Sequence, residues 1–191
     1  MFEKKTDLKT AVFFADGCEE IEGLTVVDLL YRAGIPCTKV SINAEPEVTS
    51  SHEITFRTDT TIDKLDFDEY DMLILPGGVP GTPNLRACAP LMEQVIAFHK
   101  AGKQVAAICA APGILAELGL LNGIPATCNP TRDELLKESG ALLSHDNVVV
   151  SGNIITSRAM GTAIPFGLAI VEHYLGGEAA RALGENVLYY T

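Results

Sequence analysis

The sequence lacks any apolar run long enough to cross a membrane, and the charged residues 1–7 precede no apolar stretch of the kind found in signal peptides. Basic residues are also scarce, with 14 Lys and Arg against 25 Asp and Glu and a formal net charge of −11. No basic patch is present to bind the phosphates of a nucleic acid. These absences predict a cytoplasmic protein without a membrane or nucleic-acid partner.

The cysteines show neither a disulfide framework nor a zinc-site spacing. There are 5, an odd number, and none forms a C-x-x-C pair. This pattern favours reduced thiols and offers no metal site. Gly77-Gly78 lacks the G-x-G-x-x-G context of a dinucleotide site, and no flavin is indicated. We therefore expect no cofactor.

Strand-like and helix-like segments alternate along most of the chain. Strands are predicted at 9–15, 36–42, 70–75 and 104–108, with short polar strands within 48–57, a strand ending near 127–130 and a hairpin over 147–156. Helices are predicted at 18–33, 90–101, 112–120 and 162–175. The alternation predicts one α/β domain over 1–191, with a leader at 1–8, built as a doubly wound three-layer sandwich around a mainly parallel sheet.

Cys109 ends the apolar run Gln104–Ile108, and only small residues separate it from the next helix-like segment. Small residues permit a sharp turn that presents the side chain at the tip of the strand, as in the nucleophile elbow known with serine as G-x-S-x-G. The positive end of the following helix should lower the pKa of the thiol. The alternative is an inert buried thiol that closes the strand.

Glu22 lies in line with apolar residues of its predicted helix, namely Val26, Leu29 or Leu30, and Ala33. A glutamate on this stripe should be at least partly buried, and burial favours the protonated acid. A neutral carboxyl group can donate a hydrogen bond to a thiolate, whereas a carboxylate would repel it. The alternative is a solvated glutamate that stabilises the helix N-terminus.

Gly77-Gly78 follows the buried strand at 70–75, as Asp16-Gly17 follows the first strand. The ligand crevice of a doubly wound sheet lies beyond the carboxyl ends of its strands, so these turns and Cys109 can share one rim. Backbone N–H groups at Gly77-Gly78 could bind a developing oxyanion. An ordinary strand-to-loop turn would explain the same dipeptide.

The remaining thiols and imidazoles give weaker patterns. Cys128 follows a strand end, which leaves a resolving-thiol role open. The position of His52 relative to the crevice cannot be derived from the sequence. The other residues of these two types are interpreted as packing or surface groups, namely Cys18, Cys37, Cys88, His99, His145 and His173.

Four segments together resemble the ThiJ/PfpI family, closest to its Parkinson-disease protein branch of glyoxalase III and deglycase-like members. They are Gly17–Glu22, Leu75–Gly78, Ala106–Pro112 and Thr156–Ala163, and they occur in the family's order over essentially the whole chain. The resemblance implies a flavodoxin-like fold, similar to class I glutamine amidotransferases, and a homodimer.

The resemblance also implies roles for particular residues. Cys109 matches the reactive cysteine and Glu22 the glutamate that hydrogen-bonds its sulfur. Gly77, Gly78 and Ala110 match backbone that faces the oxyanion or substrate. Arg32 matches an arginine near the dimer interface. Asn129 occupies the place where several members have a pocket histidine, and it cannot exchange a proton near neutral pH.

Three functions are compatible with this sequence. The leading hypothesis is a cofactor-free Cys/Glu enzyme that acts on methylglyoxal, glyoxal or their protein adducts during oxidative and carbonyl stress. The second is a redox-sensing stress protein or chaperone in which Cys109 is oxidised. A PfpI-type intracellular cysteine peptidase ranks last, because Asn129 replaces the histidine.

Overall fold

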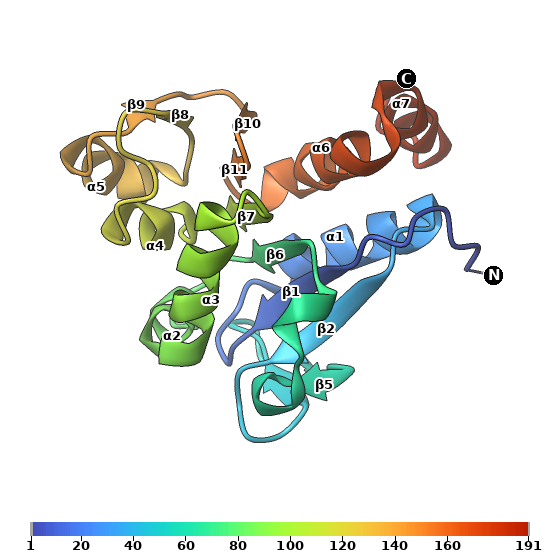
Figure 1. Cartoon of the computed structure of the whole chain (residues 1–191), viewed down its shortest axis with the longest axis horizontal. Coiled ribbons are helices and arrows are strands. Elements are labelled where there is room, and N and C mark those ends of the chain that lie inside the picture. The colour runs from blue at the N-terminus through green and yellow to red at the C-terminus, as the bar shows by residue number, and fades with distance from the viewer. Residues whose placement is uncertain (1, 191) are drawn as a thin grey trace.

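The computed structural model describes residues 2–190 and has an α/β architecture in three layers, with a mostly parallel sheet between two sets of helices (Figure 1). The central sheet has seven strands in the order β10-β11-β7-β6-β1-β2-β5. Every adjacent pair in it is parallel except β10 with β11. The prediction of a doubly wound, mainly parallel, flavodoxin-like sandwich is confirmed.

The strands of this sheet are short and mostly buried. They are β1 (Thr10–Phe14), β2 (Cys37–Ser41), β5 (Thr60–Thr61), β6 (Met72–Leu75), β7 (Gln104–Ile108), β10 (Val148–Ser151) and β11 (Ile154–Ser157). Every residue of β1 and β6 is buried, as expected for central strands that are covered on both faces. Two further pairs lie outside the sheet, β3 (Glu47–Thr49) with β4 (Thr55–Arg57) and β8 (Pro125–Ala126) with β9 (Leu142–Leu143).

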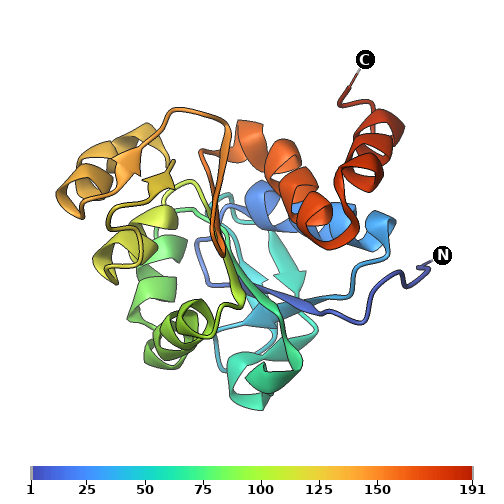
Figure 2. The same ribbon diagram turned by 45° about the horizontal axis from the view of Figure 1, so that its top comes forward.

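The helices form two layers that cover opposite faces of the sheet (Figure 2). One layer contains α1 (Glu20–Ala33), α6 (Ala163–Leu175) and α7 (Gly177–Asn186). The other contains α2 (Gly81–Ala87), α3 (Ala89–Lys100), α4 (Pro112–Glu117) and α5 (Asp133–Glu138). None of the helices within residues 2–190 combines the length and apolar character that a membrane span requires.

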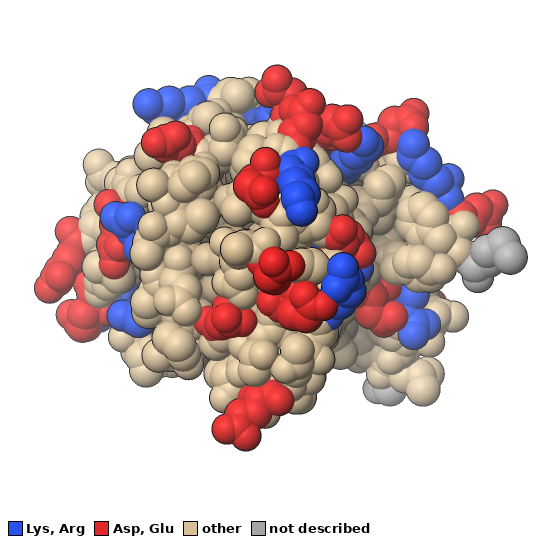
Figure 3. All heavy atoms as spheres, turned by 90° about the horizontal axis from the view of Figure 1, so that it is seen from below, with Lys and Arg blue, Asp and Glu red and all other residues tan. Residues whose placement is uncertain are grey.

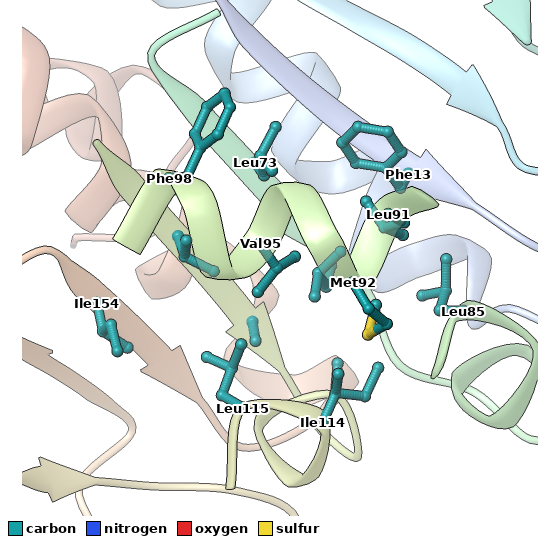
Figure 4. Close-up of a cluster of buried hydrophobic side chains, with 14 of the residues drawn as sticks. Phe13, Leu73, Leu85, Leu91, Met92, Val95, Phe98, Ile114, Leu115 and Ile154 are labelled. Carbon is teal, nitrogen blue, oxygen red and sulfur yellow. The ribbon is translucent and has the colours of Figure 1, made fainter. Parts of the chain in front are cut away.

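Each helical layer encloses its own apolar core. On the α3 side, Phe13, Leu73 and Val95 belong to a cluster in which the helix lies across β6 and β7 (Figure 4). On the α1 side, Phe14 packs so closely on the helix that a Cβ at Gly23 would lie 2.2 Å from its ring. The glycine in mid-helix is therefore explained by this close packing of helix on sheet.

The structure corrects several predicted boundaries. Helices α2, α5 and α7, the edge strand β5 and the short strand β9 have no counterpart among the predicted elements. Gly176-Gly177 predicted the end of helical structure, but Gly176 only breaks the helix at φ 84° and α7 starts one residue later. Residues 112–120 form a helix only as far as Glu117. His99 is half-buried, not a surface residue.

Candidate active site

The carboxyl ends of three neighbouring strands, β1, β6 and β7, meet at one edge of the sheet. Cys109 follows β7, Gly77-Gly78 follows β6, and α1 begins shortly after β1. The structure thus brings Cys109, Glu22 and the glycine pair to the shared rim that the sequence predicts.

Cys109 forms a strained elbow between β7 and α4. Its φ of 66° lies in the left-handed region, which a residue with a side chain rarely adopts. Two backbone hydrogen bonds hold this conformation. The N–H of Cys109 donates to the Ser157 carbonyl at 3.0 Å, and its own carbonyl accepts from the Asn129 N–H at 2.8 Å. The half-buried thiol is therefore fixed in position by its backbone.

Glu22 is 1% exposed and lies against the thiol. Its Oε2 accepts a hydrogen bond from the Gly77 N–H at 2.9 Å, and its carboxyl group is also hydrogen-bonded to Cys109. Burial raises the pKa of Glu22 to about 7, although both hydrogen bonds act in the opposite direction. The carboxyl group can therefore gain or lose a proton near neutral pH.

Burial, and next the Glu22 carboxylate, raise the pKa of the Cys109 thiol to about 12. Hydrogen bonds from the N–H groups of Ala110 and Gly78 oppose this increase without cancelling it. The predicted lowering of the thiol pKa by backbone N–H groups after Cys109 is therefore present but outweighed, and the net shift is upward. The following helix, α4, has only six residues, and its dipole is outweighed by desolvation and a neighbouring carboxylate.

The thiol and the carboxyl group titrate as a coupled pair. When Glu22 carries a proton, the negative charge that opposes a Cys109 thiolate is removed, and the carboxyl group can donate a hydrogen bond to the sulfur. One proton transfer from the thiol to the carboxylate would therefore give a thiolate beside a neutral carboxyl group.

The glycine pair leaves room for these side chains. A Cβ at Gly77 would lie 2.6 Å from Glu22 Oε2 and 2.7 Å from the Cys109 Cβ. Gly78 has a φ of +100°, and a Cβ there would lie 2.3 Å from the Glu19 backbone nitrogen. Only glycine fits both positions, which leaves the Gly78 N–H free to point at the sulfur.

Asn129 also faces the thiol. Its Nδ2 lies 3.7 Å from the Cys109 sulfur. Its Oδ1 accepts hydrogen bonds from the N–H and the hydroxyl of Thr131, at 3.1 and 2.8 Å, which orients the NH₂ group toward the sulfur. Cys128 is buried and donates to Asp133 Oδ1 at 3.5 Å, so its thiol is engaged by a carboxylate.

A sequence profile of the DJ-1/PfpI family matches residues 8–173. The chain belongs to the DJ-1/PfpI family. "Protein dj-1beta" of Drosophila melanogaster is 33% identical over 177 residues, which cover 93% of this chain and 95% of the relative. "Glutathione-independent glyoxalase DJR-1.2" of Caenorhabditis elegans is 34% identical over 171 residues, covering 88% and 89%.

A solved structure of a DJ-1 protein has the same fold. "Toxoplasma gondii DJ-1, oxidized" superposes with a TM-score of 0.91 at 31% identity, covering 96% of this chain and all of that one. The resemblance to the family, inferred from four short segments, is confirmed over almost the whole chain.

Two residues in this DJ-1/PfpI chain interact with carboxylates other than Glu22. Arg32 is in the last turn of α1, roughly 15 Å along the helix from Glu22, and its Nε pairs with Asp28 Oδ2 at 2.7 Å. His52 is in the turn between β3 and β4, where its Nδ1 lies 3.1 Å from Glu20 Oε2. No sequence pattern indicates this contact, because it depends on the hairpin folding back onto α1.

Glu19, Glu20 and His52 form the one group with three possible metal ligands found among residues 2–190, with ligand atoms within 4.8 Å of one another. Glu20 and Glu19 lie at the N-terminus of α1, where the helix dipole favours anions. The carboxylates are thus already stabilised by the helix and by His52. The cluster is explained as a contact that attaches the β3–β4 hairpin to α1.

Proposed function

We propose that this chain is a cofactor-independent enzyme of the glyoxalase III or deglycase type, which acts on methylglyoxal, glyoxal or their protein adducts in carbonyl and oxidative stress. One observation carries the proposal. The Cys109 thiol shares a hydrogen bond with a buried carboxyl group, Glu22, whose pKa is raised to about 7. A relative named as a glutathione-independent glyoxalase, 34% identical, supports the same chemistry.

In the first step, the proton of Cys109 passes to Glu22 and the thiolate attacks the aldehyde carbon of the substrate. A C–S bond forms, and the electron pair of the C=O bond moves to oxygen. The N–H groups of Gly78 and Ala110, which hydrogen-bond the sulfur, are placed to stabilise this oxyanion. Protonation of the oxygen gives a hemithioacetal.

In the second step, the Glu22 carboxylate, which has given its proton to that oxygen, removes the proton from the carbon bound to sulfur and returns it to the neighbouring carbonyl carbon, while the hydroxyl proton moves to the neighbouring carbonyl oxygen. The result is a thioester of a 2-hydroxy acid. Water hydrolyses this thioester, which releases the acid and restores the Cys109 thiol. Methylglyoxal and water thus give lactate, and no redox partner is consumed.

The test measures lactate formed from methylglyoxal by metal-free protein without glutathione. Cys109→Ala should abolish the activity, and Glu22→Gln should reduce it strongly, since glutamine cannot transfer a proton. Cys88→Ala is the matched control, because Cys88 is also half-buried but lies at the start of α3. Unchanged turnover in the Cys109→Ala protein would refute the mechanism.

A redox sensor is the second candidate, favoured by the same donors around the sulfur. Oxidation by two equivalents of peroxide would convert the Cys109 thiol to a sulfinate and release two waters. Glu22 in its protonated form and the Gly78 N–H could then hydrogen-bond the new oxygens. Intact-mass measurement after mild peroxide distinguishes the candidates. Two added oxygens at Cys109 without aldehyde turnover would support the sensor.

The peptidase alternative is disfavoured because Asn129, and not a histidine, approaches the Cys109 sulfur.

We also propose a cytoplasmic homodimer. The α1 helix presents two large apolar side chains to solvent, Ile21 at 44% and Tyr31 at 52% exposure. Light scattering after size-exclusion chromatography tests this assembly, and a mass of about 20 kDa would contradict it.

A further inference from the structure

A cavity of about 370 Å³ lies between α2, α4 and α5 and borders the candidate active site. Its wall includes Ala110, whose backbone N–H hydrogen-bonds the Cys109 sulfur. The volume falls within the range of ordinary small-molecule sites. No step of the proposed reaction on methylglyoxal uses this space.

Two arginines line the cavity. Arg86, on α2, pairs through Nε with Glu117 Oε2 of α4 at 2.7 Å. Arg132, at the end of the turn 130–132, has no ion pair with a carboxylate within residues 2–190. Its aliphatic stem lies over Gly113, where an added Cβ would be 3.8 Å from the Arg132 Cδ. The cavity therefore carries one positive charge that the chain does not neutralise.

This charge contrasts with the rest of the protein. The chain has a formal net charge of −11. On the face that Figure 3 shows, acidic side chains are spread widely and the basic side chains lie dispersed among them. An unpaired arginine on the wall of a concave site is the arrangement that binds an anion.

A buried hydroxyl supplies a second, independent observation. Thr82 lines the cavity and is 5% exposed, and its Oγ1 has no hydrogen-bond partner. The oxygen itself exposes almost no surface, so the side chain must turn about its Cα–Cβ bond to present the hydroxyl to the cavity. A buried polar group without a partner is unfavourable, so a ligand that accepts its hydrogen bond after this turn would gain affinity. An anion has acceptor oxygens for both this hydroxyl and a guanidinium.

Short backbone links connect these groups to the thiol. The Arg132 N–H donates to the Asn129 carbonyl at 2.8 Å, and Asn129 Nδ2 is 3.7 Å from the Cys109 sulfur. The Thr82 N–H donates to the Gly78 carbonyl at 2.8 Å. Arg132 and Thr82 are thus each hydrogen-bonded to a residue that approaches the sulfur.

We propose that this cavity is an anion-binding subsite, in which Arg132 and Thr82 hold a carboxylate or phosphate at the far end of an aldehyde substrate bound at Cys109. The preferred substrates are then acidic α-oxoaldehydes or their adducts, and methylglyoxal leaves the subsite empty. This assignment of substrate class rests on the proposed aldehyde activity, whereas the binding of an anion by the cavity does not.

The kinetic test compares 4,5-dioxopentanoate with its uncharged counterpart 2-oxopentanal. Wild-type protein should have the higher kcat/KM for the acid. Arg132→Gln should reduce the ratio of the two kcat/KM values about tenfold, which is the effect of one partly exposed charge-assisted hydrogen bond. Arg181→Gln is the control, because Arg181 lies on α7 and pairs with Glu185 at the surface. An equal ratio in wild-type protein and Arg132→Gln would overturn the subsite.

The binding test does not require turnover. Butyrate and, separately, inorganic phosphate are titrated into the Cys109→Ala protein while the amide NMR signals of Thr82 and Ala110 are followed. Both signals should shift on saturation, and adding Arg132→Gln should weaken binding about tenfold. The anion that binds with the higher affinity shows whether the subsite prefers a carboxylate or a phosphate. Affinity that is independent of Arg132 would overturn the proposal.

A second variant separates ligand binding from folding. Thr82→Val removes the hydroxyl at nearly constant shape, so it should raise the thermal midpoint while it weakens anion binding several-fold. A lower midpoint with unchanged anion affinity would show that the hydroxyl serves the fold. If the wild-type protein turns over no aldehyde but the amides shift as described, the proposed function fails and the anion site stands.

Discussion

Glu22→Gln should change how the stability of the protein depends on pH. The buried carboxyl has a pKa of about 7 in the folded protein, against an ordinary value of 4.5. A carboxyl whose pKa is raised by folding adds stability that is complete below the ordinary value and is lost as the pH rises through the folded value. The window for this loss therefore extends from about pH 4.5 to pH 7.

The magnitude follows from the same two values. Each pKa unit corresponds to about 1.4 kcal/mol, so ionisation of Glu22 should lower the free energy of unfolding by about 3 kcal/mol between pH 4.5 and pH 8. Glutamine carries no charge, yet its oxygen can still accept the hydrogen bond from Gly77. The Glu22→Gln variant should gain about 3 kcal/mol over wild-type protein as the pH rises across this interval.

Urea unfolding at pH 4.5 and pH 8, followed by far-ultraviolet circular dichroism at constant ionic strength, measures this difference. Titrating groups that are not coupled to Glu22 affect both proteins equally, so their contributions cancel when the two are compared. Glu93→Gln is the control, because Glu93 is exposed on α3. If Glu22→Gln and wild-type protein show parallel pH dependence, Glu22 is not the buried proton carrier that the mechanism needs.

Two glycine substitutions test the close packing around the site. Gly77→Ala should abolish turnover, because its Cβ would lie 2.6 Å from Glu22 Oε2 and 2.7 Å from the Cys109 Cβ. Steady-state kinetics measure this effect, and a wild-type kcat/KM would contradict the geometry. Gly23→Ala should lower stability in urea titrations, because overpacking against Phe14 costs about 1–3 kcal/mol and outweighs a gain of up to about 1 kcal/mol in helix propensity. A more stable Gly23→Ala protein would show that Phe14 can move aside.

The predicted helices and strands that agree with the structure carry a strong local pattern. The apolar run at 104–108 became β7, and the stripe from Glu22 to Ala33 became the inner face of α1. Gly34 ends that helix in the left-handed conformation that glycine adopts easily. Helices α2 and α5 were missed because they are short and Gly and Pro residues interrupt or precede them.

The relation between neighbouring groups was harder to predict. Sequence reasoning placed Cys109 at an elbow and Glu22 on a buried stripe, since each depends on residues within one or two turns. It did not predict the net upward shift of the thiol pKa, because that shift depends on desolvation and on the distance to Glu22, 87 positions away along the chain. Electrostatic energies vary steeply with distance and burial, which no local pattern encodes.

The sequence by itself therefore determined the layered fold, the family and the candidate residues Cys109 and Glu22, because these depend on local periodicity and on motifs in a fixed order. Only the tertiary structure decided that burial raises the pKa of Glu22 beside Cys109. It also decided that Arg132 and Thr82 meet in a cavity beside the thiol. The physical reason is the same in both cases. Desolvation, charge coupling and cavity formation arise only when segments distant in the chain come into contact.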